Sequence, residues 1–316
     1  MRTGTLWRRV IAIVFAAIVG MFCIPTAVLA AESIDVGRES SLSVYFGENG
    51  TGFPGVSFSI HRVADISADG IYTLTGNFAD YPVSLEDLDN SGWRALAQTL
   101  AAYTARDELQ PLLIQETERD GRSHFPALTT GLYLVIGEPY TAENTVYISE
   151  PMLISLPGLT GEGSWDYDAE AVCKFNREET PTGPISRKVQ KVWKDEGNEE
   201  KRPEEIAVQL LENGTVVDTV TLSRENNWEY TWENLDGGSR WQVTEAEVPD
   251  GYTVAIAQEG TVFIITNTRP SEPPPKLPQT GMLWWPVPVL ACGGLLLIAV
   301  GLIVRHRQGG ANEKEK

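Results

Sequence analysis

The recurrence of short apolar segments between turn residues is the feature of this sequence that most constrains its fold. From residue 33 to about residue 176, such segments alternate with clusters of Gly, Asp and Asn; they read SLSVYF, GVSFSIHRV, GIYTLTG, GLYLVIG, TVYIS and MLISLP. Segments of this length and spacing are typical of the strands of a β-sandwich. One stretch differs, because its apolar residues recur at helical spacing and predict an inserted helix over residues 92–106; they are Trp93, Leu96, Ala97, Leu100 and Tyr103.

The segment before this helix has the spacing of a calcium loop without the full ligand set. Asp87, Asp89 and Ser91 stand at alternate positions, but the twelfth position holds Gln98 instead of the glutamate that binds calcium through both oxygens. We therefore expect a turn that leads into a helix N-cap.

A second series of strand-like segments follows a linker at residues 179–184. The segments read VQKVW, EIAVQLL, TVVDTVTL, WEYTW, RWQVTEA and TVFIITN, and turns such as ENG, DGG and PDG join them. This pattern is all-β and of immunoglobulin-like size. The sequence therefore predicts an all-β protein with two tandem immunoglobulin-like β-sandwich domains, at residues 31–178 and 185–269.

Composition narrows the partners and the chemistry that this chain can use. Its formal charge of −18 and its pI near 4.6 disfavour nucleic acid as a partner. Of its three cysteines, Cys23 and Cys292 lie in apolar runs near the ends, which leaves Cys173 without a partner for an intrachain disulfide between those runs. The three histidines are far apart in the sequence, so we expect no metal site and no cofactor.

Both ends of the chain carry targeting features. Residues 1–30 have the arginine-rich start, the apolar run and the small-residue end of a secretory signal peptide. Near the other end, a Pro-rich spacer at residues 270–276 precedes LPQTG, a charge-free segment at residues 282–304 and a basic tail at residues 305–316. At about 1.5 Å per residue the charge-free segment is long enough to cross a bilayer. Basic residues beside a membrane segment usually lie on its cytoplasmic side, so we expect the tail to be cytoplasmic.

The residues before this membrane segment resemble the LPxTG sorting signal of Gram-positive surface proteins; they are Leu277, Pro278, Gln279, Thr280 and Gly281. The resemblance implies that a sortase cleaves between Thr280 and Gly281 and transfers the new carboxyl end to an amine. The membrane segment would then be a transient anchor. A plain single-pass membrane protein is the alternative, and it leaves the pentapeptide unexplained.

Three polar residues stand at positions where strand alternation predicts burial. Residues two apart in a strand share a face, so Lys191, Glu245 and Asn267 each lie among apolar neighbours. Burial lowers the pKa of a lysine and raises that of a glutamate. A neutral Lys191 amine could attack the side-chain carbonyl of Asn267 while Glu245 moves the protons, leaving an amide cross-link and ammonia. The alternative is a Lys–Glu pair on an edge strand that faces water, with an ordinary asparagine at the strand end.

Residues 185–269 resemble the Cna B-type domain of collagen adhesins over their full length. The resemblance rests on KVWKD, RPEEIAVQLLENG, WEYTWENLDGG, ITNT and WQVTEAEVPDGY. The last of these is similar to the family's E-box, YxLxETxAPxGY, and Glu245 stands at the position of its glutamate. The resemblance implies that Glu245 catalyses an isopeptide bond between Lys191 and Asn267. Lys188 and Lys194 are nearby lysines, but both lie off the motif position.

Residues 42–176 resemble, over most of their length, the N-terminal domain of sortase-assembled pilins. WDYDAEAVCK, from Trp165 to Lys174, keeps the spacing of the pilin motif WxxxVxVYPK, although Ala, Ala, Val and Cys replace its Val, Val, Tyr and Pro. Lys174 is also the first lysine of the chain. The resemblance implies that its amine accepts Thr280 of another subunit. A solvated lysine at a strand end is the alternative.

These features predict a structural subunit of a covalently polymerised pilus that supports adhesion, secreted and attached to the Gram-positive cell wall. Sortase, other pilin subunits and peptidoglycan would be its partners, with a host extracellular-matrix ligand as a further candidate. Apart from the single-turnover reaction at Glu245, we expect no enzyme activity. The alternative is a wall-anchored adhesin, or an ancillary tip or base pilin, that does not polymerise. A wall-anchored enzyme is a third class, but the sequence offers it no nucleophile, histidine and acid set.

Overall fold

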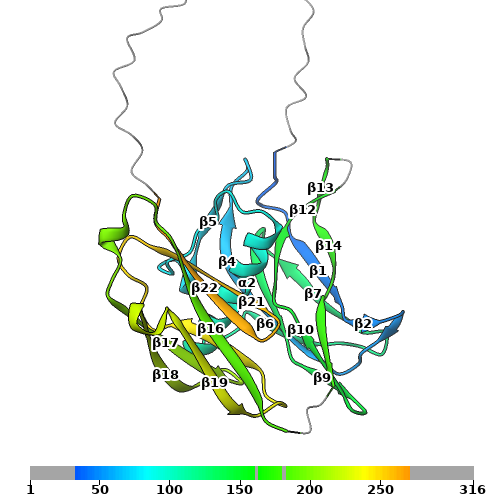
Figure 1. Cartoon of the computed structure of the whole chain (residues 1–316). Coiled ribbons are helices and arrows are strands. Elements are labelled where there is room, and N and C mark those ends of the chain that lie inside the picture. The colour runs from blue at the N-terminus through cyan, green and yellow to red at the C-terminus, as the bar shows by residue number, and fades with distance from the viewer. Residues whose placement is uncertain (1–32, 161–162, 180–182, 271–316) are drawn as a thin grey trace, which may run out of the picture. The chain divides into compact units, whose positions relative to one another are not determined.

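The structure, a computed structural model, describes residues 33–160, 163–179 and 183–270 (Figure 1). The predicted signal peptide, sorting pentapeptide, membrane segment and basic tail lie outside these residues. Among the described residues, no helix is both long enough and apolar enough to cross a membrane. The described residues up to Pro270 belong to one compact unit.

The first sandwich is built from fifteen strands, most of them short: β1 (Ser40–Tyr45), β2 (Gly47–Glu48), β3 (Thr51–Gly52), β4 (Ser57–Ile66), β5 (Tyr72–Leu74), β6 (Leu113–Glu116), β7 (Arg122–Leu128), β8 (Gly131–Gly137), β9 (Tyr140–Ala142), β10 (Thr145–Ser149), β11 (Met152–Leu156), β12 (Gly158–Leu159), β13 (Trp165–Asp166), β14 (Asp168–Val172) and β15 (Phe175–Glu179). Its larger sheets have the strand orders β14-β1-β7, β15-β10-β9 and β11-β8-β4-β5, and β6 also pairs with β4. The first strand, β1, runs parallel to β14, which lies near the end of this sandwich.

Strand alternation explains the core of this sandwich. In β1, Leu42 and Val44 are fully buried and the residues that follow each of them are half-buried. Strand β8 is buried at almost every residue, as expected of a strand that is covered on both faces. Aromatic rings fill the centre, where Phe46 meets Phe53 and Phe58 edge to face with ring centroids 5.1 and 5.7 Å apart.

One α-helix, α2 (Asn90–Arg106), is inserted among the strands of the first sandwich, as predicted, and a short 3₁₀ turn, η1 (Gly76–Phe78), precedes it. The N-cap of α2 is Asp89, whose carboxylate accepts a hydrogen bond from the amide of Gly92 at 2.8 Å. This confirms the prediction of a capped helix start. The helix packs on the face of β8 that looks away from the aromatic core, and its residues Leu96, Ala97, Leu100 and Ala101 form a second apolar cluster with residues of β4 and β8.

The second sandwich contains seven strands and two 3₁₀ turns: β16 (Ile185–Lys194), η2 (Glu199–Lys201), β17 (Glu205–Glu212), β18 (Thr215–Ser223), η3 (Arg224–Asn226), β19 (Glu229–Leu235), β20 (Trp241–Glu245), β21 (Thr253–Glu259) and β22 (Val262–Thr268). Its two sheets have the orders β19-β16-β22-β21 and β18-β17-β20. The first strand, β16, pairs in parallel with the last, β22. The predicted fold class is therefore confirmed for the described residues, which are mostly strands in two sandwiches with one inserted α-helix.

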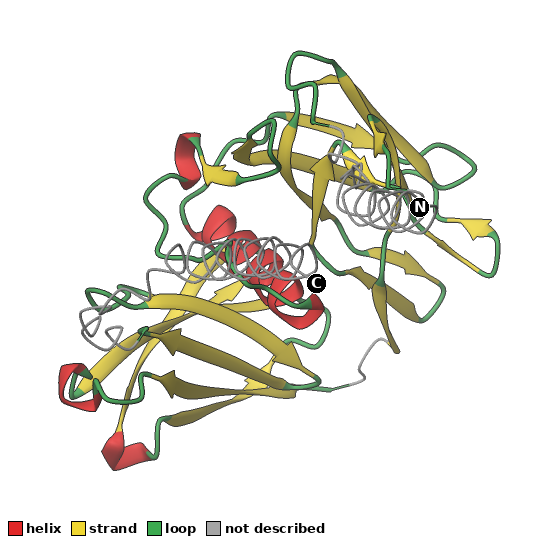
Figure 2. Ribbon diagram, turned by 90° about the horizontal axis from the view of Figure 1, so that it is seen from above, coloured by secondary structure: helices red, strands yellow, loops and turns green. Residues whose placement is uncertain are grey.

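Helix α2 also packs against the second sandwich, and Figure 2 shows it between the two groups of strands. Strand β21 is an edge strand of its sheet, and three of its outward amides donate to groups of the first sandwich. The bonds run from Val254 to the carbonyl of Pro82 at 2.8 Å, from Ile256 to Thr99 Oγ1 at 2.7 Å, and from Gln258 to Gln98 Oε1 at 2.9 Å. Uncovered edge strands invite non-native pairing, so these bonds protect β21 as well as joining the sandwiches.

Candidate functional site

Lys191, Glu245 and Asn267 come together in the core of the second sandwich. Lys191 lies in β16, Asn267 lies in the adjacent parallel strand β22, and Glu245 ends β20 in the other sheet. Lys191 is 5% exposed and the other two residues are 0% exposed. Alternation explains this burial, because the residues two positions earlier in the three strands are apolar and buried as well; they are Val189, Val243 and Ile265.

The polar atoms of this cluster lie within reach of one another. Lys191 Nζ is 3.3 Å from Glu245 Oε1. The side-chain amide nitrogen of Asn267 donates to both carboxylate oxygens of Glu245, at 3.2 and 3.0 Å. Asn267 Oδ1 is buried and has no hydrogen-bond partner among the described residues. Turning the amide over would bring this oxygen to Glu245, where a protonated carboxyl group can donate to it.

Burial controls the protonation of the Lys191–Glu245 pair. Loss of water around the Lys191 amine lowers its pKa to about 8, although the nearby Glu245 carboxylate opposes the shift. Burial likewise raises the pKa of Glu245, against the attraction of Lys191. Both shifts favour a neutral amine beside a neutral acid, because a proton transfer within the pair removes two buried charges.

This arrangement holds the three components of an aminolysis reaction. Lys191 supplies a nucleophile, Asn267 supplies a carbonyl carbon, and Glu245 supplies a group that can both give and take a proton. Within the described ranges, no group of three or more His, Cys, Asp or Glu side chains could hold a metal ion. The positions of Lys191, Glu245 and Asn267 support acid–base and nucleophilic chemistry.

Aromatic and charged side chains pack beside the Lys191–Glu245–Asn267 cluster at the end of β16. The Lys191 amine lies over the ring of Trp193, 4.2 Å from its centroid. Tyr252, the last residue of the WQVTEAEVPDGY motif, donates to Asp195 Oδ2 at 2.9 Å. Asp195 is 2% exposed and forms an ion pair with Arg202. Two of the motifs that predicted the site, KVWKD and WQVTEAEVPDGY, are thus hydrogen-bonded to each other beside it.

The other two lysines of β16 lie in different surroundings. Lys188 forms an ion pair with Glu229 at 2.6 Å, with its side chain 36% exposed, and Lys194 is exposed. The side chains of Lys191 and Glu245 are fully buried. The alternative of a water-facing edge pair is therefore wrong, because β16 lies between β19 and β22 rather than at an edge of its sheet.

Helix α2 contributes residues to this site that the sequence pattern did not indicate. Arg106 Nη1 donates to the backbone carbonyl of Glu245 at 3.1 Å. Tyr103 is buried in the core of the second sandwich, and its pKa is raised by that burial and then by the nearby Glu245 carboxylate. One signal was available in the sequence. Between Leu96 and Thr104 the helix carries apolar and small residues on more than one of its faces, which is typical of a helix buried on more than one side.

Lys174 is exposed and lies in the first sandwich, in the two-residue connection between β14 and β15. Its backbone is fixed, because its carbonyl accepts a hydrogen bond from the amide of Glu150 at 2.8 Å and the preceding Cys173 is 2% exposed in the core. The side chain lines a groove of about 720 Å³ between the start of α2, β11 and β14. Trp165 is half-buried in β13, which pairs with β12. Lys174 therefore lies in a different sandwich from the buried cluster.

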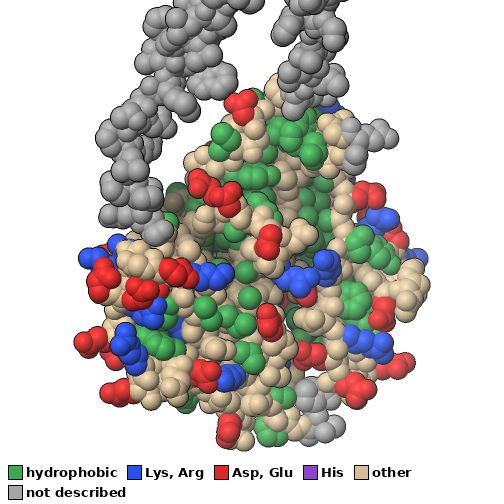
Figure 3. Space-filling view, turned by 45° about the horizontal axis from the view of Figure 1, so that its top comes forward, with side chains coloured by type: hydrophobic (Ala, Val, Ile, Leu, Met, Phe, Trp, Pro, Cys, Tyr) green, Lys and Arg blue, Asp and Glu red, His purple; other side chains and the backbone are tan. Residues whose placement is uncertain are grey.

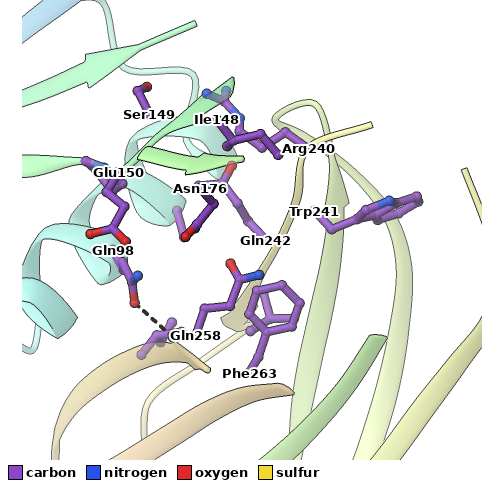
Figure 4. Close-up of a pocket in the computed structure, with 14 residues that line it drawn as sticks. Gln98, Ile148, Ser149, Glu150, Asn176, Arg240, Trp241, Gln242, Gln258 and Phe263 are labelled. Carbon is purple, nitrogen blue, oxygen red and sulfur yellow. Dashed lines mark hydrogen bonds between the residues drawn. The ribbon is translucent and has the colours of Figure 1, made fainter. Parts of the chain in front are cut away.

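The junction of the two sandwiches contains a small cavity, of about 80 Å³, lined by α2, β10, β20, β21 and the residues beside them (Figure 4). The drawn hydrogen bond joins Gln98 of the helix to Gln258 of β21 at 2.9 Å. Pockets for small ligands usually measure about 300–1,000 Å³, so this cavity is too small to be one.

On the face seen in Figure 3, acidic and basic side chains are interspersed, with no continuous basic area.

Comparison with known proteins assigns a family to the second sandwich. Residues 187–268 match the family model described as Cna protein B-type domain, which confirms the resemblance seen in the sequence. The chain is 40% identical over 240 residues to a protein described as collagen adhesin, from Staphylococcus aureus. That match covers 64% of this chain and 19% of the adhesin, so the chain spans about a fifth of the relative's length.

Solved structures similar to this chain include two pilins and a B repeat unit. The full-length major pilin SpaD from Corynebacterium diphtheriae is 16% identical, with a TM-score of 0.29, and 76% of this chain and 66% of that chain are covered. The fimbrial protein FimP from Actonomyces oris is 15% identical, with a TM-score of 0.30 and coverage of 72% and 62%. A single B repeat unit of the collagen-binding surface protein of Staphylococcus aureus is 18% identical, with a TM-score of 0.27 and coverage of 74% and 99%.

Proposed function

From the Cna protein B-type domain over residues 187–268, we propose that this chain is a structural subunit of a covalently polymerised pilus on a Gram-positive cell. The observation that carries the proposal is the buried cluster of Lys191, Glu245 and Asn267, which sets a nucleophile and its target on the first and last strands of that domain. An isopeptide bond there would brace an exported domain that has no disulfide to do so. Such bracing suits a subunit of an extended surface fibre.

In the proposed reaction, the Lys191 amine attacks Asn267 Cγ and forms a new C–N bond. Glu245 gives a proton to Oδ1, takes one from the attacking nitrogen, and passes it to Nδ2, which leaves as ammonia. The carbonyl then reforms and the Oδ1 proton returns to Glu245. One amine and one primary amide thus give one secondary amide and ammonia, without a redox change. Both partners are consumed, so the chain acts once on itself and is not a turnover enzyme.

The proposed links between subunits use Lys174. A sortase cysteine would cleave the bond between Thr280 and Gly281 of one subunit and retain its acyl group. The Lys174 amine of another subunit would then displace the thiol and form an amide with Thr280. Exposure of Lys174 and the groove beside it support this role, because an acyl-enzyme needs access to the amine.

The same chemistry accounts for anchoring and location. Transfer of the final Thr280 to peptidoglycan, in place of Lys174, would attach the assembled fibre to the cell wall. The proposed partners are thus sortase, further copies of this chain or other pilins, and peptidoglycan. Since the relative from Staphylococcus aureus is described as a collagen adhesin, a host extracellular-matrix ligand is proposed as a further partner.

Immunoblots of cell-wall extracts from the native strain test this proposal. We expect the wild-type chain to give a ladder of covalent multimers and Lys174→Ala to give the monomer alone. Lys188→Ala is the matched control, because it removes a partly exposed lysine from the second sandwich and should keep the ladder. A single wild-type band that Lys174→Ala leaves unaltered would refute polymerisation and favour a wall-anchored adhesin or an ancillary pilin.

A further inference from the structure

Glu245 belongs to the second sandwich, where its strand pairs with β17, but its backbone carbonyl is bonded to a residue of the first sandwich. The amide of Ala246 donates to the carbonyl of Ala207 in β17 at 2.9 Å, so the carbonyl of Glu245, in the same peptide unit, points away from β17. In the described part of its sheet β20 is an edge strand, and this carbonyl lies on the edge side. Arg106 Nη1 donates to it at 3.1 Å, in the place that a further strand would occupy.

The guanidinium of Arg106 is held in its orientation by contacts other than the one with Glu245. Asp107 accepts hydrogen bonds from Arg106 Nε and Nη2 at 2.7 and 2.8 Å, a two-point contact that orients the guanidinium plane. The hydroxyl of Tyr81 donates to the same carboxylate at 2.6 Å. The rings of Tyr81 and Tyr103 stack with centroids 4.9 Å apart, and the guanidinium lies 4.5 Å from the Tyr103 centroid. The remaining Arg106 nitrogen is thereby directed at the Glu245 carbonyl.

Helix α2 is also anchored to the second sandwich one to two turns before Arg106. The side chains of Gln98 and Thr99 accept hydrogen bonds from two amides of β21, and Tyr103 is buried in the second core. Arg106, at the last position of the helix, is therefore the end of an element already seated on that sandwich. Its contact with Glu245 depends on this seating.

The position of Glu245 matters because it is the last residue of β20. The ladder to β17 holds the strand up to this point, and the chain then turns away. Amide aminolysis requires the reacting groups to be closely aligned, and a displacement of about 1 Å can cost on the order of 100-fold in rate. A contact that fixes the backbone of Glu245 thus fixes the reach of its carboxyl group to Lys191 and Asn267.

We propose that Arg106 is a positioning residue for the Lys191–Asn267 cross-link, so that bond formation in the second sandwich depends on the docked helix of the first. The proposal rests on the cross-linking reaction described above. Arg106 touches none of the reacting atoms and acts through the backbone of Glu245. The consequence is an order of events in which the first sandwich folds and docks before the second becomes covalently closed.

The test is a time course of cross-linking in the full chain. The chain and its variants are made by pulsed cell-free synthesis with detergent, samples are quenched in acid, and the intact mass reports the loss of one ammonia. Arg106→Ala should slow the reaction by about tenfold or more, given the sensitivity of such reactions to misplacement. Arg106→Lys should restore part of the rate, because an ammonium group can still donate to the carbonyl.

Gln98→Ala is the matched control. It also removes one hydrogen bond between α2 and the second sandwich, but that bond ends on Gln258 and not on Glu245. We expect its rate to stay within about twofold of wild type, since the alignment of the reacting groups is unchanged. Equal slowing by Arg106→Ala and Gln98→Ala would overturn the positioning role and indicate a general effect of docking.

Two further outcomes separate this inference from the proposed function. If the wild-type chain cross-links and Arg106→Ala keeps pace with it, the positioning role is wrong while the cross-link stands. If the wild-type chain never loses ammonia, the cross-link itself is refuted, and the positioning role with it. If Arg106→Ala does not fold, as judged by near-UV circular dichroism, Arg106→Gln gives the same comparison with a smaller change in packing.

Discussion

Lys188 and Lys191 show how far three positions along one strand can separate two identical side chains. Lys188 is paired with Glu229 in contact with water, whereas Lys191 is carried into the core by strand alternation. There its amine has Glu245 as its charged neighbour at 3.3 Å, and desolvation outweighs that attraction and lowers its pKa to about 8. Burial therefore makes a neutral, nucleophilic Lys191 amine accessible near neutral pH.

Bond formation should therefore have a bell-shaped dependence on pH. The reactive pair holds one proton, which is present between the raised pKa of Glu245 and the lowered pKa of Lys191, about 8. Below this window both groups are protonated and the amine cannot attack. Above it both are deprotonated, and no acid remains to protonate the amide.

The measurement is the initial rate of ammonia loss, followed by intact mass after pulsed synthesis and transfer to buffers from about pH 5 to 10. Glu245→Ala is the control and should show no ammonia loss at any pH. A rate that keeps rising well above pH 8 would contradict the assignment of Glu245 as the proton carrier.

At the scale of elements, the paired first and last strands are what the proposed bond would secure. Strands β16 and β22 are parallel neighbours over their lengths, with Lys188 opposite Val262 and Lys194 opposite Thr268. Parallel neighbours cannot be joined by a tight turn, so these two are brought together by everything folded between them. A bond from Lys191 to Asn267 would close that long loop covalently.

Blocking the bond should therefore lower the unfolding temperature. For a disulfide that closes a loop of this length, the chain-entropy argument gives about 4 kcal/mol, and an isopeptide bond constrains the unfolded chain in the same way. We expect Asn267→Ala to lower the unfolding temperature by about 10 °C in scanning calorimetry. Glu245→Gln blocks the reaction by another route and should give a similar drop. An Asn267→Ala chain as heat-stable as cross-linked wild type would contradict the bracing role.

At the scale of the whole molecule, the helix makes the two sandwiches parts of one unit. Its apolar residues cover β8 of the first sandwich, while Thr99 and Tyr103 reach the second. Thr99 is 0% exposed, and its hydroxyl accepts from the Ile256 amide at 2.7 Å while donating to the carbonyl of Ala95 at 2.7 Å. The helix was predicted as part of the first domain, and the structure adds that it belongs to both cores.

Removing the Thr99 hydroxyl should weaken this unit. Thr99→Val keeps the shape of the side chain and leaves a buried amide of Ile256 without an acceptor, which costs about 1–3 kcal/mol. Urea unfolding measures the loss, preferably in an Asn267→Ala background where the cross-link cannot form. Thr219→Val, at an exposed position of β18, is the control and should be nearly neutral. No difference between the two variants would show that the junction adds nothing to stability.

Some of these features could be predicted from the sequence, and the reasons are specific. Lys191, Glu245 and Asn267 could be found because each interrupts an apolar face of period two, so that local alternation alone implied burial. Which residues of other segments would meet them is a matter of long-range contact. Arg106 ends a helix more than a hundred residues before Glu245 in the sequence. The apolar pattern of the helix and that of β20 each indicate a local structure, but neither indicates that the two elements touch.

The parallel pairing of β16 with β22 has a mechanical consequence for the proposed fibre. Tension would enter each subunit at Lys174, follow the chain through β15 into β16, cross at Lys191 to Asn267, and leave toward Thr280. The sequence before Lys174 and the chain between the two cross-linked residues would lie off this path. Each subunit could then carry load through two short covalent stretches, while the first sandwich apart from β15 and most of the second sandwich remain unstretched and free to present their surfaces.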